Sequence, residues 1–370
     1  MISVVITNFN GAHLLKKNLP KIISLLEKSR LAMPADRQEY ELIVVDDCST
    51  DDSRAVLEKI DFKEADPSAR LRAIFAPKNR GFAGTMDMGI RAAKAEYVFT
   101  LKTDTVPESP EYFNFLLSHF TRHSGERSDS RISKGTFRDP GLGQDDGGKL
   151  FAVSATLKTI ENGKEELRGG GQVYFEKGFF LHRRKIPRHS GEPEATPESL
   201  NTTLRDPGQA RMTEDIYSSW ADGSASVFNK AIYEKIGGFD NIYNPFYWED
   251  VDLGYRAWKA GYTIEYEPKA ILVHDFEKGA INSHYTKEQQ KAVSLRNQFI
   301  FVWKNSDLKH LLLYFLWETY HHAVALKNGQ FSWIIIYWQA FIKWPQILKR
   351  RIGQKKLNKF SDDQILKIIP

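Results

Sequence analysis

The sequence predicts an α/β fold, a doubly wound and mostly parallel sheet followed by a C-terminal helical region. Two observations carry this prediction. Short apolar runs rich in β-branched residues alternate with helix-forming segments over residues 1–117, and the connections are short. Such alternation is typical of a parallel sheet covered by helices. Beyond residue 310 lie two aromatic, apolar segments of helical length.

Each element of the first third follows from its own pattern. Strands are predicted at residues 2–7, 41–47, 70–77 and 97–101, where apolar runs stop at polar residues. Helices are predicted at residues 14–28, 49–60 and 84–95. Ser49 or Thr50 is expected to cap the second helix, because a side-chain oxygen there accepts hydrogen bonds from free backbone amides.

The remaining elements are less regular. Residues 118–149 and 189–209 are polar and loop-like, with strand candidates at 149–157 and 171–175 between them. A helix is expected from residue 249, where Glu249, Asp250 and Asp252 crowd its first turn. Acids in that position favour the helix dipole by about 0.3–1 kcal/mol each, so capping is the plain alternative to a catalytic role.

Polar groups follow three of the predicted strands at the point where each strand ends. These groups are Thr7-Asn8, Asp46-Asp47 and Asp104. In open α/β sheets, ligands bind beyond the carboxyl ends of the strands. We therefore expect these side chains, which are far apart in the sequence, to share one crevice.

Composition limits the class of protein. The chain has 370 residues, so one large domain with an appendage is expected, and its net charge of +5 does not indicate nucleic acid. A single cysteine, Cys48, excludes an intramolecular disulfide and fits a reducing compartment. We expect no signal peptide and no membrane-spanning helix, because no apolar run reaches about 18 residues.

The C-terminal region combines aromatic residues with positive charge. Four tryptophans lie between residues 317 and 344, and seven lysines and arginines lie between residues 343 and 359 without an acid among them. This combination suits the anionic inner surface of a membrane. The alternative is a helical cap on the main domain with a solvated tail.

Six motifs occur in one order. They are "SVVITNFNG", "ELIVVDDCSTDDS", "NRGFAGTMDMGIRAA", "VFTLKTDTVPE", "DGSASVFNKAIYEKIGGFD" and "YWEDVDLGYRAWKAGY", the last followed by His274. Together they resemble the family 2 glycosyltransferases of the inverting GT-A type, and most of all the rhamnosyltransferase-like branch that builds bacterial surface polysaccharides. The resemblance covers roughly residues 1–118 and 215–276.

The resemblance implies roles for individual residues. Asp250, beside Glu249 in "WED", matches the general base of the family, and Asp104 matches the last acid of its metal and diphosphate motif. Lys102 stands at the first position of that motif, where the family prefers Asp or Asn, and a protonated lysine cannot bind a cation. His274 matches a histidine that helps to hold the metal or the diphosphate. A divalent cation, Mg²⁺ or Mn²⁺, on Asp104 and His274 is therefore implied less firmly than the nucleotide.

The remaining matched positions concern the two substrates. The residues that match nucleotide-sugar contacts are Thr7, Asn8, Asn10, Asp46, Asp47, Asn79, Arg80, Gly81, Lys102 and Asp104. Those that match the acceptor pocket are Gly237, Gly238 and Trp248. The implied division is a glycosyltransferase domain at 1–300, made of a nucleotide-binding half (1–117), a variable insert (118–212) and an acceptor half (213–300), with an aromatic and basic region at 301–370.

The implied activity is inverting transfer of a sugar from a UDP- or dTDP-linked donor to a glycan or lipid-linked glycan in bacterial surface polysaccharide synthesis. The implied location is cytoplasmic, with membrane contact from the inner face. The alternatives are an inactive nucleotide-sugar-binding module, for which Lys102 is the best argument, and a sugar nucleotidyltransferase. The latter would carry a Gly-rich, basic loop after the first strand, where this chain has "TNFNGAHLL". A nicotinamide-dependent oxidoreductase would need Gly-X-Gly-X-X-Gly there, which is absent.

Overall fold

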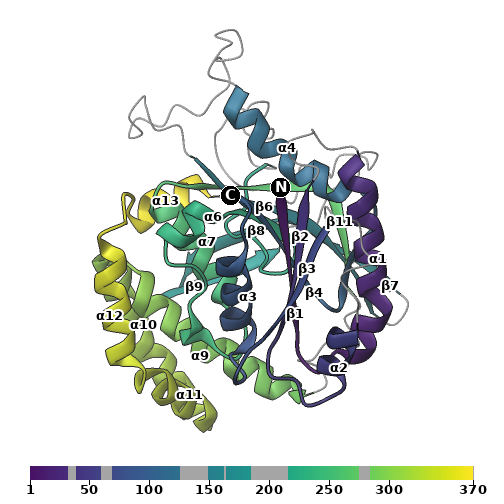
Figure 1. The fold of residues 1–370 in the computed structure, drawn as a ribbon. Coiled ribbons are helices and arrows are strands. Elements are labelled where there is room, and N and C mark those ends of the chain that lie inside the picture. Colours follow the sequence, from purple (N-terminus) through teal and green to yellow (C-terminus); the bar gives the residue numbers. More distant parts are fainter. Residues whose placement is uncertain are drawn as a thin grey trace.

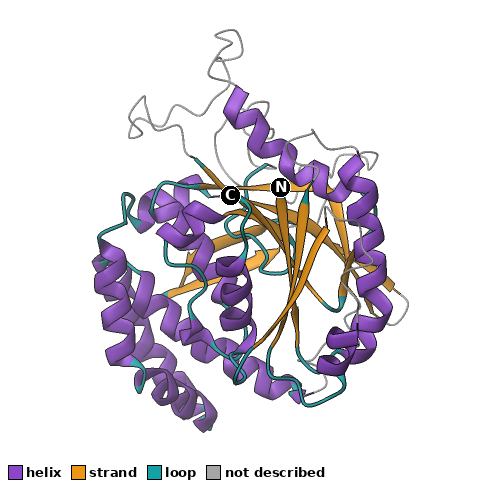
Figure 2. Cartoon of the chain, in the orientation of Figure 1, coloured by secondary structure: helices purple, strands orange, loops and turns teal. Residues whose placement is uncertain are grey.

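A computed structural model describes residues 1–31, 39–59, 69–125, 149–161, 164–184, 216–274 and 284–369. In this part of the chain a nine-stranded mixed sheet has helices on both faces, and further helices gather at one side (Figures 1 and 2). The strand order is β3-β2-β1-β4-β10-β6-β11-β5, with β7 paired to β6.

The N-terminal half of the sheet is parallel, as predicted. Its strands are β1 (Ile2–Asn8), β2 (Tyr40–Asp46), β3 (Ala69–Phe75) and β4 (Tyr97–Lys102). All adjacent pairs among them are parallel. The connecting helices are α1 (Ala12–Leu31), α2 (Ser53–Lys59) and α3 (Gly81–Ala92). The predicted cap of α2 is wrong. The helix begins at Ser53, and the side chain of Asp51 accepts the Ser53 amide at 2.9 Å.

The second half of the sheet is mixed. Strand β10 (Ser226–Asn229) pairs antiparallel with β4 and with β6 (Leu150–Glu161). Strand β6 pairs parallel with β11 (Thr263–His274), and β5 (Thr105–Pro107) pairs antiparallel with β11. Strand β7 (Lys164–Arg168) forms a hairpin with β6. The antiparallel β10 brings its N-terminal end beside the C-terminal end of β4, because Ser226 lies opposite Thr100.

Alternation along β1 assigns the helices to two faces. Val4 and Ile6 point into a core with α1 and α4 (Glu111–Gly125), whereas Val5 points into a core with α3. Helix α3 can approach the sheet closely because residue 89 is glycine. A Cβ there would lie 2.3 Å from Val5 Cγ1. The second core continues through α6 (Lys230–Lys235), the 3-10 turn η3 (Asn241–Tyr243) and α7 (Glu249–Lys259).

The predicted C-terminal helical region is present and shares a core with the sheet. Its helices are α9 (Lys287–Asn305), α10 (Leu308–Lys327), α11 (Phe331–Phe341), α12 (Trp344–Lys355) and α13 (Asp362–Ile368). Helix α9 is the buried member, and α10, α11 and α12 pack around it (Figure 1). A separate hairpin, β8 (Gly171–Glu176) with β9 (Phe179–Arg184), lies between these helices and the main sheet. Among the described residues, no helix is both long and apolar enough to cross a membrane.

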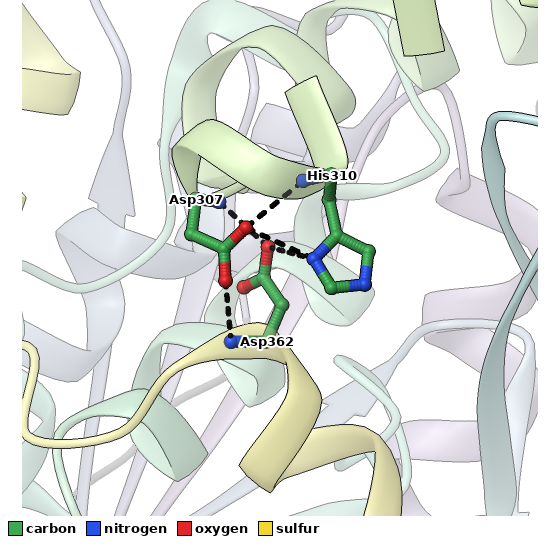
Figure 3. Close-up of side chains that lie close together, drawn as sticks. All are labelled: Asp307, His310 and Asp362. Carbon is green, nitrogen blue, oxygen red and sulfur yellow. Dashed lines mark hydrogen bonds and ion pairs between the residues drawn. The ribbon is translucent and has the colours of Figure 1, made fainter. Parts of the chain in front are cut away.

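Buried polar side chains fasten the end of the chain to the domain. Asp307 caps α10 by accepting the His310 amide at 3.0 Å, and its other oxygen accepts the Asp362 amide at 3.1 Å (Figure 3). Asp362 in turn accepts the Asp307 amide at 2.6 Å, the Tyr255 hydroxyl at 2.7 Å and Lys259 Nζ at 2.6 Å. All four carboxylate oxygens have protein donors, so this Asp307–His310–Asp362 cluster is a structural junction and not a metal site.

Candidate active site

The ends of β1 and β2 form one hydrogen-bonded unit. Asn8 and Asp46 face each other in the ladder, and Asn8 Nδ2 donates to Asp46 Oδ1 at 2.7 Å. The hydroxyl of Ser49 donates to the same oxygen at 2.6 Å and accepts the amide of Asn10 at 2.8 Å. Thr7, next in the strand, is buried beside Lys102 of β4. The predicted nucleotide-binding residues Thr7, Asn8, Asn10 and Asp46 thus lie together at the carboxyl edge of the sheet.

The loop before α3 is tied to the same edge. The Asp47 carboxylate is buried and accepts the Arg80 amide at 2.6 Å, while burial raises the pKa of Asp47 despite this bond. Asn79 accepts the Gly81 amide at 3.1 Å, and Gly81 adopts a left-handed φ of 68°. A Cβ on Gly81 would lie 3.0 Å from the Asn244 side chain. Glycine here lets the loop pass between the two halves of the domain.

The turn between β4 and β5 presents Asp104 to His274. His274 ends β11 and lies opposite Thr105 in the sheet, which places its Nε2 atom 3.3 Å from Asp104 Oδ2. Lys102 Nζ lies 4.0 Å from the other carboxylate oxygen. Burial acts to raise the pKa of Asp104, but Lys102 and His274 outweigh it and keep that pKa below its ordinary value. The carboxylate is therefore a stable negative charge.

The donor set at Asp104 fits a divalent cation with two protein ligands. Asp104 Oδ1 is buried and accepts no hydrogen bond from the described residues, so one oxygen has capacity to spare. The His274 ring nitrogen stands beside the second oxygen. An oxygen and an imidazole nitrogen suit Mn²⁺. Lys102 adds a fixed positive charge to the same place.

The three acids in the first turn of α7 have different surroundings. Asp252 faces inward and is held by Arg256 at 2.7 Å and Lys304 at 2.9 Å, so it is structural. Glu249 and Asp250 have no such partner among the described residues. Burial raises the pKa of both, and neighbouring negative charges, including that of Asp222 on each, raise it further. A carboxylate with a raised pKa is suited to accept a proton near neutral pH.

A strained turn sets the position of this helix. Tyr247 and Trp248 have φ values of 70° and 75°, which side chains other than glycine rarely adopt. The Asn297 amide in α9 holds the turn by donating to the carbonyl oxygens of Tyr243, Phe246 and Tyr247 at 2.6, 2.9 and 2.9 Å. Strain of this kind persists where surrounding contacts impose it, and it clusters at functional sites.

Two site residues were missed by the sequence analysis. Asp222, in the loop before β10, forms an ion pair with Arg184 at the end of β9. The charge of Arg184 holds the pKa of Asp222 far below its ordinary value, although burial opposes this. Asp222 lies in "ADGSAS", which has the composition of an ordinary turn, and Arg184 ends a hairpin with no helical or catalytic pattern. Neither position carried a signal that the sequence could reveal.

Lys102 connects the two groups of carboxylates. Its charge lowers the pKa of Asp104, of Asp222 and of Glu249. Arg184 similarly lowers the pKa of Asp250. Charges influence one another's pKa in this way only when they lie near one another. The antiparallel pairing of β10 with β4 is the structural cause, because it brings the loop of Asp222 beside Lys102.

The predicted acceptor residues lie in two places. Trp248 is buried against His182 of β9, with ring centroids 4.7 Å apart, next to the carboxylates. Gly237 and Gly238 contact other residues. Their carbonyl oxygens accept Arg91 at 3.3 Å and Arg256 at 2.6 Å, and a Cβ on Gly238 would meet Asp87 of α3. Both glycines have positive φ, at 92° and 67°. Through Arg256, the Gly238 carbonyl helps to hold α7 in place.

The N-terminal third of the chain is similar to a known protein family. Residues 3–124 match the model of glycosyl transferase family 2. This stretch, about a third of the chain, is similar to that family. The match ends within α4, so it covers the nucleotide-facing edge, Lys102 and Asp104, but not Asp222, Asp250 or His274.

Two curated relatives match shorter stretches. The human dolichyl-phosphate beta-glucosyltransferase is 34% identical over 110 residues, which are 30% of this chain and 33% of that protein. The N-acetylglucosaminyl-diphospho-decaprenol L-rhamnosyltransferase of Mycobacterium tuberculosis is 42% identical over 55 residues, which are 15% of this chain and 18% of that protein. The chain therefore spans a third or less of the length of these relatives.

A solved structure supports the fold across more of the chain. GalNAc-T7 with UDP, GalNAc and Mn²⁺ superposes with a TM-score of 0.52 at 16% identity, over 82% of this chain and 47% of that one. At this identity the likeness concerns the fold alone. The architecture is a GT-A-like α/β fold with a C-terminal helical region, as the sequence predicted.

Proposed function

We propose that this protein is an inverting glycosyltransferase that moves a sugar from a nucleoside-diphosphate sugar to an acceptor hydroxyl. The observation that carries the proposal is the convergence of two differently tuned carboxylates on one space. Asp104 is held as a stable anion beside Lys102 and His274, whereas Asp250 is held with a raised pKa beside Asp222 and Arg184. One suits the charged leaving group, and the other suits proton removal.

The residues divide the reaction between them. Asp250 takes the proton of the acceptor hydroxyl as that oxygen attacks the anomeric carbon. Glu249, whose pKa burial raises to about 8, is the neighbouring carboxyl group and is the weaker candidate for an anion near neutral pH. The bond to the diphosphate breaks on the opposite side, so configuration inverts in one displacement and no enzyme nucleophile is needed. Lys102, beside Asp104, offsets the negative charge that develops on the leaving diphosphate.

Asp104 and His274 would hold a divalent cation, Mn²⁺ or Mg²⁺. When bound, the ion would supply Lewis-acid stabilisation of diphosphate oxygens. The edge formed by Thr7, Asn8, Asn10, Asp46 and Asp47, with the loop Asn79–Gly81, would hold the nucleoside. Trp248 would shape the acceptor pocket, and Gly237 and Gly238 would act on it indirectly by fixing α7 through Arg256.

The substrates are proposed at the level of chemical class. The donor is UDP- or dTDP-linked, and the acceptor is a glycan or lipid-linked glycan in bacterial surface polysaccharide synthesis, on the cytoplasmic side of the membrane. The names of the two relatives support a lipid-linked acceptor, because they contain dolichyl-phosphate and diphospho-decaprenol. The second name supports the rhamnosyltransferase-like branch. The division into a domain at 1–300 and a region at 301–370 is likewise a proposal.

Turnover of a panel of UDP-, dTDP- and GDP-sugars, with and without Mn²⁺, tests the activity. We expect release of nucleoside diphosphate from one donor class. Asp250→Asn should lower this turnover at least about 10³-fold, while calorimetry shows nucleotide affinity within about twofold of the wild type. Full turnover by the variant would remove Asp250 from the role of base.

An inactive nucleotide-sugar-binding module is the second candidate. Lys102, at a position where the family has a metal-binding acid, is the observation that favours it. Tight binding of a sugar nucleotide without any turnover, in the presence of Mn²⁺ and of lipid-linked acceptors, would establish this alternative instead.

A further inference from the structure

We propose that the exposed apolar and basic surface of α10, α11 and α12 binds an anionic lipid membrane. The helices that carry this surface, called here the α10–α12 face, lie at one side of the molecule, beside the main sheet (Figure 1). It is formed by side chains that the fold leaves in solvent although they are large and apolar. The proposal does not depend on the nucleotide site or on the proposed reaction.

Helix α10 is apolar on its outer side. Leu308, Leu312, Leu316 and Tyr320 recur every four residues and are 56–73% exposed, and Leu326 continues the row at 56%. The inner side of the same helix is closed by Tyr314 and Ala325, which are buried. A helix that packs on the core with one side normally presents polar residues on the other. This helix therefore has a second apolar face that the described chain does not cover.

Helix α11 repeats the pattern. Phe331, Ile335, Trp338 and Ile342 follow one another at spacings of four, three and four residues, so they form one line along the helix. They are 55–77% exposed. Ring contacts extend the line toward α12, with centroids 5.3 Å apart for Trp338 and Phe341 and 5.9 Å apart for Phe341 and Trp344. Exposed tryptophan and phenylalanine at such a surface are typical of the membrane interface.

Helix α12 adds positive charge to the apolar row. Ile352 is 66% exposed and lies between Lys349 and Lys356 on the same side of the helix, with Lys355 also exposed. The sequence from residue 331 to residue 361 contains seven lysines and arginines and no acid. Three of these cations turn toward the protein, where Lys343, Arg350 and Arg351 bond to Ile242, Asp240 and Trp303.

Charge decides which partner this face suits. Two copies of the face would bring their lysines together in a medium of low dielectric constant, which costs free energy. A membrane with anionic headgroups would pair with each lysine, at about 1 kcal/mol per residue, and would also bury the apolar row. An anionic bilayer is therefore the occupant that satisfies both properties of the surface.

Vesicle flotation of the full chain tests the proposal. Phosphatidylcholine vesicles are compared with vesicles in which about a third of the lipid is phosphatidylglycerol. We expect binding to the anionic vesicles that weakens as salt is raised. Replacing three residues of the face, Leu316→Asn, Ile342→Asn and Ile352→Asn, should lower the partition coefficient by about tenfold or more. The matched control, Ile160→Asn with Ile216→Asn, changes exposed apolar residues elsewhere and should leave it unchanged.

A second variant, which changes only charge, distinguishes loss of membrane binding from loss of folding. Lys349→Glu, Lys355→Glu and Lys356→Glu alter only exposed side chains, and they should abolish the preference for anionic vesicles while the thermal unfolding temperature stays the same. Equal binding to neutral and anionic vesicles, or binding to neither, would overturn the proposal. The proposal would also be overturned if light scattering showed a dimer of the wild type, a monomer of the Asn variant, and no vesicle binding by either. That result would assign the face to a second copy of the chain.

Discussion

The charges around Asp250 should determine the acid limb of the pH–rate profile. Asp250 must be deprotonated to act as the base, so turnover falls as pH drops through its pKa. Burial raises that pKa, Asp222 raises it further, and Arg184 lowers it. We therefore expect the acid limb to lie above the ordinary aspartate pKa of about 3.9.

Two substitutions should move this limb in opposite directions. Arg184→Met removes the positive neighbour and should shift the limb of kcat/KM to higher pH, by about one unit. Asp222→Asn removes the negative neighbour and should shift it to lower pH. The double variant should return close to the wild type. Shifts of the same sign in both single variants would contradict the arrangement of charges described here.

Residues at strand ends were easier to predict than those that surround them. Asp104 and Asp46 follow apolar runs, and their convergence follows from parallel topology alone. Asp250 needed the resemblance, because acids in a first turn are also normal caps. Asp222 and Arg184 could not be found, since their roles arise from a pairing between a loop and a hairpin that are 38 residues apart.

A buried histidine links α4 to β11. His119 Nδ1 lies 2.5 Å from Glu265 Oε2, and its Nε2 lies 2.8 Å from Glu267 Oε2. Burial acts to lower the pKa of His119, but the two carboxylates outweigh it and raise that pKa above 6.5. The pKa of Glu267 is lowered below 4.5, although burial opposes this. Below the raised pKa of His119, helix α4 is thus held by an imidazole between two carboxyl groups.

The stabilisation from the contact of His119 with Glu265 and Glu267 should depend on pH. A raised histidine pKa stabilises the fold below pH 6.5, and this contribution is lost as pH rises through the pKa of the folded state. The lowered pKa of Glu267 adds stability above pH 4.5 that is lost on acidification. Urea unfolding of His119→Gln should therefore show a deficit of about 2 kcal/mol between these values, shrinking at alkaline pH. A deficit that grows with pH would exclude a protonated His119.

Individual elements were predicted better than their order. The four N-terminal strands lie within one or two residues of the predicted ranges, because apolar runs and turn residues are local signals. The position of β10 between β4 and β6 was not predicted, and neither were β5 and β7. Strand pairing is non-local, and a four-residue strand such as β10 carries no direction in its pattern.

The end of the chain should contribute strongly to global stability. Asp362 is fully buried and forms an ion pair with Lys259, which is itself buried. Asp362→Ala would leave that ammonium without its carboxylate, and we expect a loss of about 3–5 kcal/mol in the free energy of unfolding. Denaturant titration monitored by tryptophan fluorescence measures this loss.

The neighbouring residue provides the control. Asp363 has a half-exposed side chain that pairs with Lys309 at 2.7 Å and, more distantly, with His310 at 3.6 Å. Asp363→Ala should leave the unfolding midpoint almost unchanged, because exposed ion pairs contribute little. Equal losses for both variants would mean that α13 is held by its apolar side chains and not by the junction in Figure 3.

The hairpin of β8 and β9 touches the C-terminal helices at its tip and the carboxylates at its end. Its turn lies against Trp317 and His321 of α10, and Arg184 ends the same hairpin beside Asp222. From Phe179 to Arg184 an extended strand spans about 17 Å. With the α10–α12 face resting on a bilayer, β9 would therefore keep the carboxylates within a short, fixed distance of the helices that touch the lipid. Such a site suits an acceptor hydroxyl that lies near the lipid surface.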